Sequence, residues 1–122
     1  MSILKRIKSG STRGERKSEL VRGTLDLLVL RTLELRPLHG VAVAERISQL
    51  TGGTFVVPPG SLFPALHKLE QEGWIAGKWA TAENDRRVKT YTLTAAGRRQ
   101  LTAEKLQWHR VVAAVGQVLE EA

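Results

Sequence analysis

The chain has 122 residues, which suits a single domain, and its 19 lysines and arginines outnumber the 12 acidic residues to give a net charge of +7. The absence of cysteine excludes disulfides, thiolate zinc sites and cysteine nucleophiles. No apolar run approaches the roughly 20 residues of a membrane span, which favours a cytoplasmic protein. The positive net charge favours an anionic partner, and nucleic acid is a better candidate than a membrane surface.

Residues 1–17 differ from the rest of the chain in composition. They include one acidic residue, Glu15, and the glycines at positions 10 and 14 make the segment a poor helix. Its basic residues are Lys5, Arg6, Lys8, Arg13, Arg16 and Lys17. We interpret the segment as a basic arm, which is either solvated or in contact with DNA phosphates.

Two helices are expected after this arm. Residues 18–36 are apolar on most faces, as in a buried helix, and Pro37 ends this helix because proline disfavours helical geometry in the residue before it. Residues 40–51 carry apolar side chains at helical spacing, and His39 is expected at the start of this second helix. Residues 55–57 are expected to form a short extended segment.

A third helix is expected over residues 60–72, with Gly73 as its left-handed stop. Its buried face holds Leu62, Leu66 and Leu69. Pro64 is placed near the first turn, where a missing N–H costs little because these nitrogens have no helical acceptor. Ser61 and the free backbone N–H groups at the helix start suit phosphate binding.

A β-hairpin follows the third helix. Residues 74–79 and 88–93 carry β-branched and aromatic residues, as strands do, and residues 80–87 form a polar, turn-rich loop. A helix followed by such a hairpin is the arrangement of a winged helix, in which the helix enters a DNA groove and the wing lies beside it.

The candidate DNA contacts lie on the third helix and on the wing. Those on the helix are Ser61, Pro64, His67, Lys68 and Gln71. Those on the wing are Asn84, Arg86, Arg87 and Lys89. The helix itself is nearly neutral, because Lys68 is accompanied by Glu70 and Glu72. It is therefore suited to reading bases, and most of the electrostatic attraction is expected from the wing and the arm.

From Thr94, a good N-cap, the chain is expected to be helical to its end. A heptad pattern runs along this helix at Leu101, Lys105, Trp108, Val112, Val115 and Leu119. A helix of about 25 residues would be roughly 37 Å long, so its far end outruns a small core and should pack against another chain. Trp108 is expected either in the dimer core or, paired with its copy, in a cavity that binds a flat apolar ligand.

These elements predict a mainly α (α+β) fold, a winged helix-turn-helix with a two-stranded wing and a long C-terminal dimerisation helix. The expected parts are a basic arm over residues 1–17, a DNA-binding domain over 18–94 and the dimerisation helix over 95–122. The histidines are scattered, and the sequence has no nucleophile triad, phosphate loop or paired-carboxylate motif. We therefore predict no enzymatic activity, no metal site and no cofactor.

Five segments, in this order, resemble the PadR family of bacterial transcriptional regulators. They are GTLDLLVL at 23–30, PLHG at 37–40, PGSLFPALHKLE at 59–70, GWI at 73–75 and YTLTAAG at 91–97. The single C-terminal helix resembles the smaller subfamily. The chain departs from the family at Phe63, where members usually have tyrosine, and in its basic arm, which is longer than most members carry.

The resemblance implies a homodimeric winged-helix repressor that binds palindromic promoter DNA and releases it when a small effector binds, such as a phenolic acid or a hydrophobic drug. By position, it assigns the recognition helix to residues 60–72 and the wing to residues 80–89. In some small members a tryptophan on the last helix lines a drug-binding pore, and Trp108 resembles that residue.

We therefore predict a homodimeric repressor of a nearby promoter, bound to double-stranded DNA at an inverted repeat and relieved by a small hydrophobic or aromatic effector. Dimerisation would set two recognition helices roughly 34 Å apart, about one turn of DNA. Two other functions stay open: a winged-helix module that binds protein without binding DNA, and a membrane-surface protein acting through residues 1–17.

Overall fold

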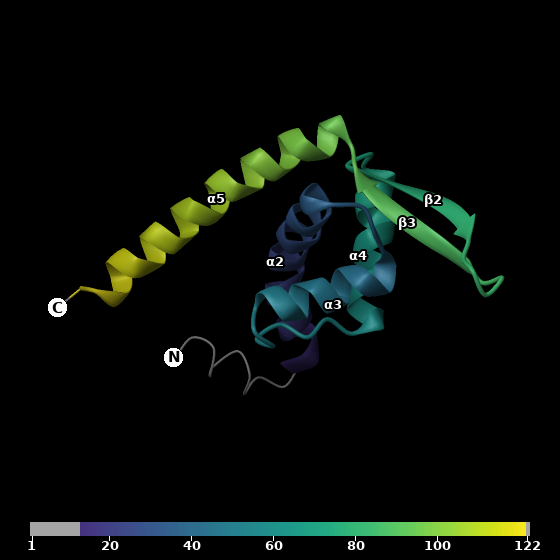
Figure 1. Ribbon diagram of the computed structural model, residues 1–122. Helices are drawn as coiled ribbons and strands as arrows, with labels where there is room; N and C mark the ends of the chain where they lie inside the picture. The colour runs from purple at the N-terminus through teal and green to yellow at the C-terminus, as the bar shows by residue number, and fades with distance from the viewer. Residues whose placement is uncertain (1–12, 122) are drawn as a thin grey trace.

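The computed structural model describes the backbone of residues 13–121 and the side chains from residue 23 onward. Within this range, four α-helices surround a core and a small antiparallel sheet projects from it (Figure 1). The elements are α2 (Arg13–Leu35), β1 (Leu38–His39), α3 (Gly40–Leu50), α4 (Pro59–Gln71), β2 (Ile75–Thr81), β3 (Arg87–Leu93) and α5 (Ala95–Leu119). None of these helices has the length and apolar character needed to cross a membrane.

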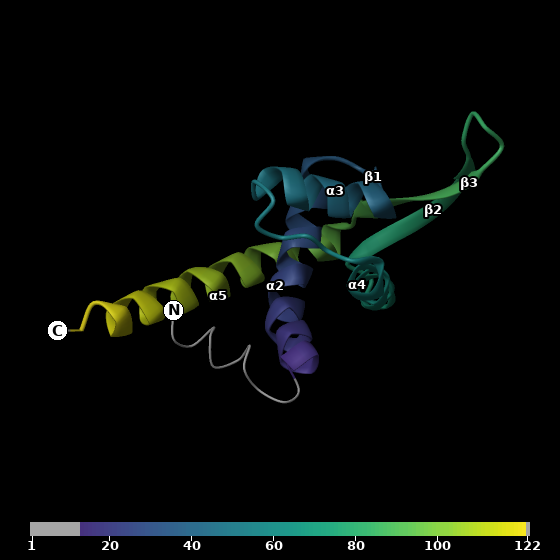
Figure 2. The same ribbon diagram turned by 90° about the horizontal axis from the view of Figure 1, so that it is seen from below.

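The core forms where α2, α3 and α4 meet, with the bases of the strands and the first turns of α5 closing it. Its largest fully buried side chains come from all of these elements: Val29, Leu30, Val43, Ile47, Leu62, Leu66, Leu69, Ile75 and Leu101. The predicted leucine face of the third helix is therefore confirmed. From this core the wing and the C-terminal half of α5 extend in opposite directions (Figure 2).

The predicted two-stranded wing is confirmed as β2 and β3, and a third strand extends the sheet to the order β1-β3-β2, with both pairs antiparallel. The additional strand, β1, pairs Leu38 with Tyr91 and His39 with Thr90. His39 Nδ1 lies 3.1 Å from Thr90 Oγ1, so its side chain joins the sheet although the residue precedes α3 as expected. A strand of two residues has no periodicity, and only its tertiary pairing defines it.

The first helix starts earlier than predicted. α2 begins at Arg13, so residues 13–17, expected in the basic arm, lie in a helix. Gly14 lowers the stability of the helix by about 1 kcal/mol. The helix can tolerate this cost because its later turns pack in the core. Residues 55–57, predicted as extended, are not part of the sheet, and Phe55 and Val57 pack against the core from the loop before α4.

The start of α4 also differs from expectation. The first full helical bond runs from the Leu62 N–H to the Pro58 carbonyl oxygen at 2.9 Å, and the Ser61 N–H donates to the same oxygen at 3.0 Å. Pro64 lies beyond this turn, inside the helix, so its missing N–H removes a regular helical hydrogen bond. Because Pro59 has no N–H either, the helix start offers fewer free donors for a phosphate than expected.

The junction between the wing and α5 is tightly built. Thr94 caps α5 as predicted, accepting a hydrogen bond from the Gly97 N–H at 3.0 Å, and its hydroxyl donates to the Gly73 carbonyl oxygen at 2.7 Å. A Cβ at Gly97 would collide with the carbonyl oxygen of Trp74, so this helical position requires glycine. Gly73 ends α4 with a φ of 79°, as predicted. These contacts fix the direction in which α5 leaves the domain.

Candidate nucleic-acid interface

The central row of the outward face of α4 carries no fixed charge. Its inward positions are buried, and a row at helical spacing on the opposite side is exposed: Gly60, Pro64, His67 and Gln71. Ser61 is half-buried at the edge of this face. The structure therefore places three of the predicted contact residues, Pro64, His67 and Gln71, along one accessible ridge.

One flank of this ridge is held by an ion pair to α2. Lys68 Nζ donates a hydrogen bond to Asp26 Oδ2 at 2.8 Å, and Asp26 is only 7% exposed. The hydrogen bond and the negative charge of Asp26 raise the pKa of Lys68 above its usual value. Lys68 thus has an intramolecular partner that sequence reasoning missed, because Asp26 lies in another helix and 42 residues away.

The other flank is held by an ion pair to the wing. Lys89 Nζ donates to Glu70 Oε1 at 2.9 Å, and this hydrogen bond is the main cause that raises the pKa of Lys89. The Lys89 side chain crosses β2 directly over Gly77, where any Cβ would collide with its Cε atom. The Lys89 side chain therefore reaches back toward the base of the wing and ties the wing to α4.

The tip of the wing is a short turn over residues 82–86. The Ala82 N–H donates to the Arg86 carbonyl oxygen at 2.7 Å, and Asn84 Oδ1 accepts a hydrogen bond from the Arg86 N–H at 3.2 Å. Asp85 has a φ of 62°, in the left-handed region that aspartate tolerates. The Asn84 side chain thus supports the turn, and Arg86 and Arg87 are exposed beside it.

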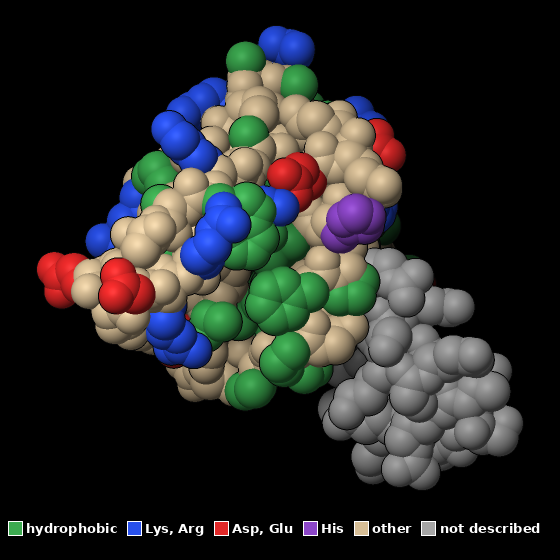
Figure 3. All heavy atoms as spheres, turned by 90° about the vertical axis from the view of Figure 1, so that its right-hand side faces the viewer, with side chains coloured by type: hydrophobic (Ala, Val, Ile, Leu, Met, Phe, Trp, Pro, Cys, Tyr) green, Lys and Arg blue, Asp and Glu red, His purple; other side chains and the backbone are tan. Residues whose placement is uncertain are grey.

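Trp79 is a surface residue of the wing that sequence reasoning missed. Its side chain is 54% exposed, and the guanidinium carbon of Arg87 lies 5.1 Å from the centre of its ring. Trp79 pairs with Lys89 across the hairpin, and Arg87 is the diagonal neighbour on the same face, so the strand register could have suggested the contact. Figure 3 shows this side of the molecule, where lysine and arginine side chains lie beside exposed apolar ones.

The predicted arm residues are divided by the start of α2. Lys5, Arg6 and Lys8 lie outside the described residues. Arg13, Arg16 and Lys17 lie on the first turns of α2. A contact between these residues and DNA stays a prediction.

The far half of α5 has an exposed apolar face. The predicted residues Trp108, Val112, Val115 and Leu119 belong to it, together with Val111 and Val118, which the heptad pattern did not include. Leu101, predicted at the dimer interface, is 1% exposed and lies in the core of its own chain, which corrects that prediction. Lys105 Nζ lies 3.6 Å from Glu34 Oε1, so the first turns of α5 face α2.

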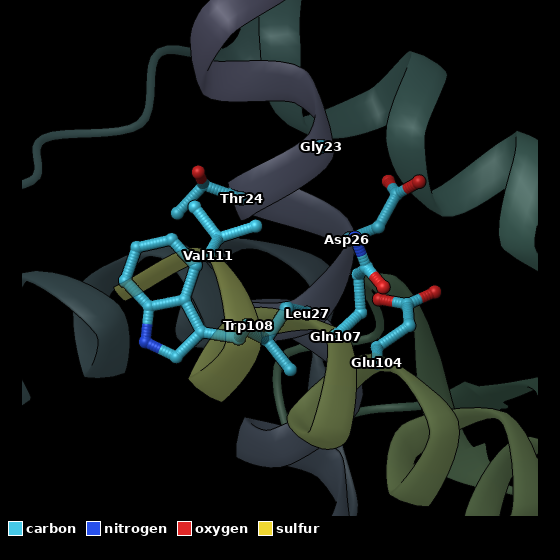
Figure 4. Close-up of a pocket in the computed structure, with 8 residues that line it drawn as sticks. All are labelled: Gly23, Thr24, Asp26, Leu27, Glu104, Gln107, Trp108 and Val111. Atoms are coloured by element: carbon cyan, nitrogen blue, oxygen red, sulfur yellow. The ribbon is translucent and has the colours of Figure 1, made fainter. Parts of the chain in front are cut away.

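A hollow of 470 Å³ lies between α2 and α5. It is lined by Gly23, Thr24, Asp26, Leu27, Glu104, Gln107, Trp108 and Val111. Figure 4 shows Trp108, Val111 and Thr24 toward one end, and Asp26, Gln107 and Glu104 toward the other. The hollow therefore joins an apolar, aromatic part to an acidic part.

The helix, its exposed ridge and the hairpin beside it define a winged-helix protein. The family model described as the transcriptional regulator PadR-like family matches residues 29–103. The chain belongs to this family and is a DNA-binding transcriptional regulator.

Individual relatives agree with this assignment. The crystal structure of a PadR family transcriptional regulator from Eggerthella lenta is 33% identical, with a TM-score of 0.73 over 85% of this chain and 88% of its own. The transcriptional regulator Rv3488 of Mycobacterium tuberculosis is 29% identical over 71% of this chain and 78% of its own length. A transcriptional regulator from Clostridium thermocellum shares the fold with a TM-score of 0.75, at 21% identity over 81% of this chain and 96% of its own.

We expect Lys68→Met to lower the free energy of unfolding by about 1–2 kcal/mol at neutral pH, because it leaves the buried Asp26 carboxylate without its cation. Urea denaturation measures this loss. Since the pKa of Lys68 is raised in the folded state, the bond stabilises the fold below the unfolded-state pKa and is lost as the pH rises through the folded-state pKa. The difference between the two proteins should therefore shrink at alkaline pH.

The matched control is Lys78→Met, which removes an exposed lysine of β2 and should change stability by less than about 0.5 kcal/mol. Equal stability of Lys68→Met and Lys78→Met would mean that the Asp26–Lys68 bond contributes nothing.

Proposed function

We propose that this protein is a homodimeric, sequence-specific repressor of a nearby promoter. The observation that carries the proposal is the exposed, uncharged ridge of α4 beside a basic wing, in a member of a transcriptional regulator family. A ridge of this kind suits the major groove, where base edges are read by hydrogen bonds and apolar contacts. His67 and Gln71 supply the polar groups of the ridge.

Affinity and specificity would come from different parts of this surface. Lys68 and Lys89 have carboxylate partners within the chain, so they contribute less positive charge to DNA than their number suggests. Arg86 and Arg87 on the wing are exposed, and neither has a carboxylate partner within the described residues. We infer that the wing attracts and positions the DNA backbone while the ridge of α4 reads bases.

A salt titration tests this division. The double variant Arg86→Ala, Arg87→Ala should weaken binding to all sequences and reduce the slope of log affinity against log salt concentration by up to about two. Gel shifts on a promoter fragment at several salt concentrations measure the slope. The matched control is Arg98→Ala, Arg99→Ala, which removes two exposed arginines from α5 and should leave the slope unchanged. An unchanged slope in the wing variant would exclude the phosphate contact.

The exposed apolar face of α5 supports the homodimer. A face of several large apolar side chains is uncommon on a monomer, and a second copy of the same helix can cover it around a two-fold axis. Two copies of α4 would then meet successive major grooves of an inverted repeat, with half-sites roughly 34 Å apart.

We expect Val115→Glu to raise the dissociation constant of the dimer at least about tenfold, because it places a charge inside the apolar contact. Sedimentation velocity over a range of concentrations measures this change. Gln117→Glu is the matched control, since it adds the same charge to the opposite face of α5 and should leave the dimer intact. Equal dimerisation of the two variants would place the interface elsewhere.

The hollow beside Trp108 supports relief by a small effector. Its volume and aromatic wall suit a flat apolar molecule, and it lies against α2, the helix that also contacts α4. A ligand that separates α2 from α5 would alter the spacing of the two α4 helices in the dimer, and so weaken binding to an inverted repeat.

Flat aromatic compounds should therefore lower operator affinity of the wild-type protein by at least about fivefold, and Trp108→Ala should abolish this response. Competition gel shifts with a panel of such compounds measure it. Leu106→Ala is the control, since Leu106 is exposed on α5 and does not line the hollow. If the Trp108→Ala protein responds like the wild type, the hollow is not the effector site.

A further inference from the structure

We propose that Phe63 and Pro64 of α4 contact the C5-methyl groups of thymines in the major groove, so that each half of the operator carries T·A pairs opposite these two residues. The inference rests on the proposed binding of DNA by α4 and adds the chemistry that the helix recognises. Three features of α4 support the inference. They are an exposed aromatic ring, an exposed proline inside the helix, and ion pairs that involve the neighbouring side chains Lys68 and Glu70.

Phe63 is the exposed member of an otherwise buried apolar set. Leu62 and Leu66 on the same helix are 2% and 1% exposed, whereas Phe63 is 45% exposed. The ring is nevertheless held in place, because one edge of it packs against Gly40. A Cβ atom added to Gly40 would lie only 3.2 Å from Cε1 of Phe63. An ordered, half-exposed ring next to the ridge of α4 presents apolar surface to whatever α4 binds.

Pro64 lies inside a helix, where proline is unfavourable, and it gains no burial in return. A proline inside a helix costs about 3 kcal/mol, since it removes a hydrogen bond and its ring clashes with the preceding turn. Burial of the ring could offset this cost, but Pro64 is exposed on the ridge. Residues that violate local preference without a structural gain tend to mark functional positions.

The polar groups of α4 leave room for such a contact. Lys68 is bonded to Asp26 and Glu70 to Lys89, so each of these two charged side chains beside the ridge has a partner of opposite charge within the chain. The side chains that remain at and beside the centre of the ridge are Phe63, Pro64, His67 and Gln71. In the major groove the apolar group on a base edge is the thymine methyl, and contact with phenylalanine is one of the ways in which it is read.

The experiment removes the methyl group from the DNA. After selection of the operator from random sequence, each thymine is replaced in turn by deoxyuridine, which lacks only this methyl. At one or two positions of each half-site, the wild-type affinity should fall by about twofold to fourfold, the effect of uncovering one methyl group. At the same positions, Phe63→Ala or Pro64→Ala should bind the two DNAs equally.

Two variants guard against a loss of folding. Pro64→Ala restores a helical residue and should fold at least as stably as the wild type. Phe63→Leu keeps an apolar side chain and should retain part of the sensitivity to deoxyuridine. Thermal unfolding followed by circular dichroism checks all of these proteins.

The outcomes separate the inference from the proposed function. If the protein binds a specific operator and no deoxyuridine substitution weakens this binding, the thymine contact is wrong and the proposed function is unaffected. Sensitivity that persists in both Phe63→Ala and Pro64→Ala would overturn the assignment to these residues. Failure to select any operator would overturn the proposed function, and the inference with it.

Discussion

The burial of α4 against α2 and α3 is the constraint on which the rest of this structure depends. Leu62, Leu66 and Leu69 turn one face of the helix into the core, so the opposite face must point outward. Because these leucines are close-packed, they set the rotation of the helix about its axis. The ion pairs on the two flanks, one to α2 and one to the wing, support the same orientation. The ridge of α4 is thus presented in one orientation.

The same two ion pairs change the distribution of charge. In a chain with a net charge of +7, the outward row of the proposed recognition helix is uncharged, because its residues are glycine, proline, histidine and glutamine, and the lysine beside the row is bonded to a buried carboxylate. Long-range attraction by positive charge is insensitive to sequence, whereas contacts to base edges are specific. In the proposed function, the helix discriminates between sequences and the wing arginines attract the DNA backbone, with Arg87 placed over the ring of Trp79.

α5 changes its environment along its length. Its first turns are part of the domain, where Gly97 fits against Trp74 and Leu101 enters the core. Beyond them the helix leaves the domain (Figure 1), and its large apolar side chains are exposed. One helix therefore runs from the wing past the hollow beside Trp108 to the proposed dimer contact.

The sequence by itself determined the elements whose signals are local. Apolar spacing located three helices, Thr94 marked the start of α5, Gly73 ended α4, and alternation marked the hairpin. The motifs at 23–30 and 59–70 led to the correct family. Each of these signals lies within a few residues of the chain, where periodicity and capping act.

Only the tertiary structure decided which of the predicted contact residues are accessible. Lys68 meets a carboxylate 42 residues away, Lys89 meets one 19 residues away, and Leu101 faces its own core instead of a partner. β1 exists only through pairing with β3. Such contacts depend on how helices and strands pack in space, and no pattern along one element encodes them. The sequence indicated a DNA-binding surface, and the packing determined which side chains that surface presents.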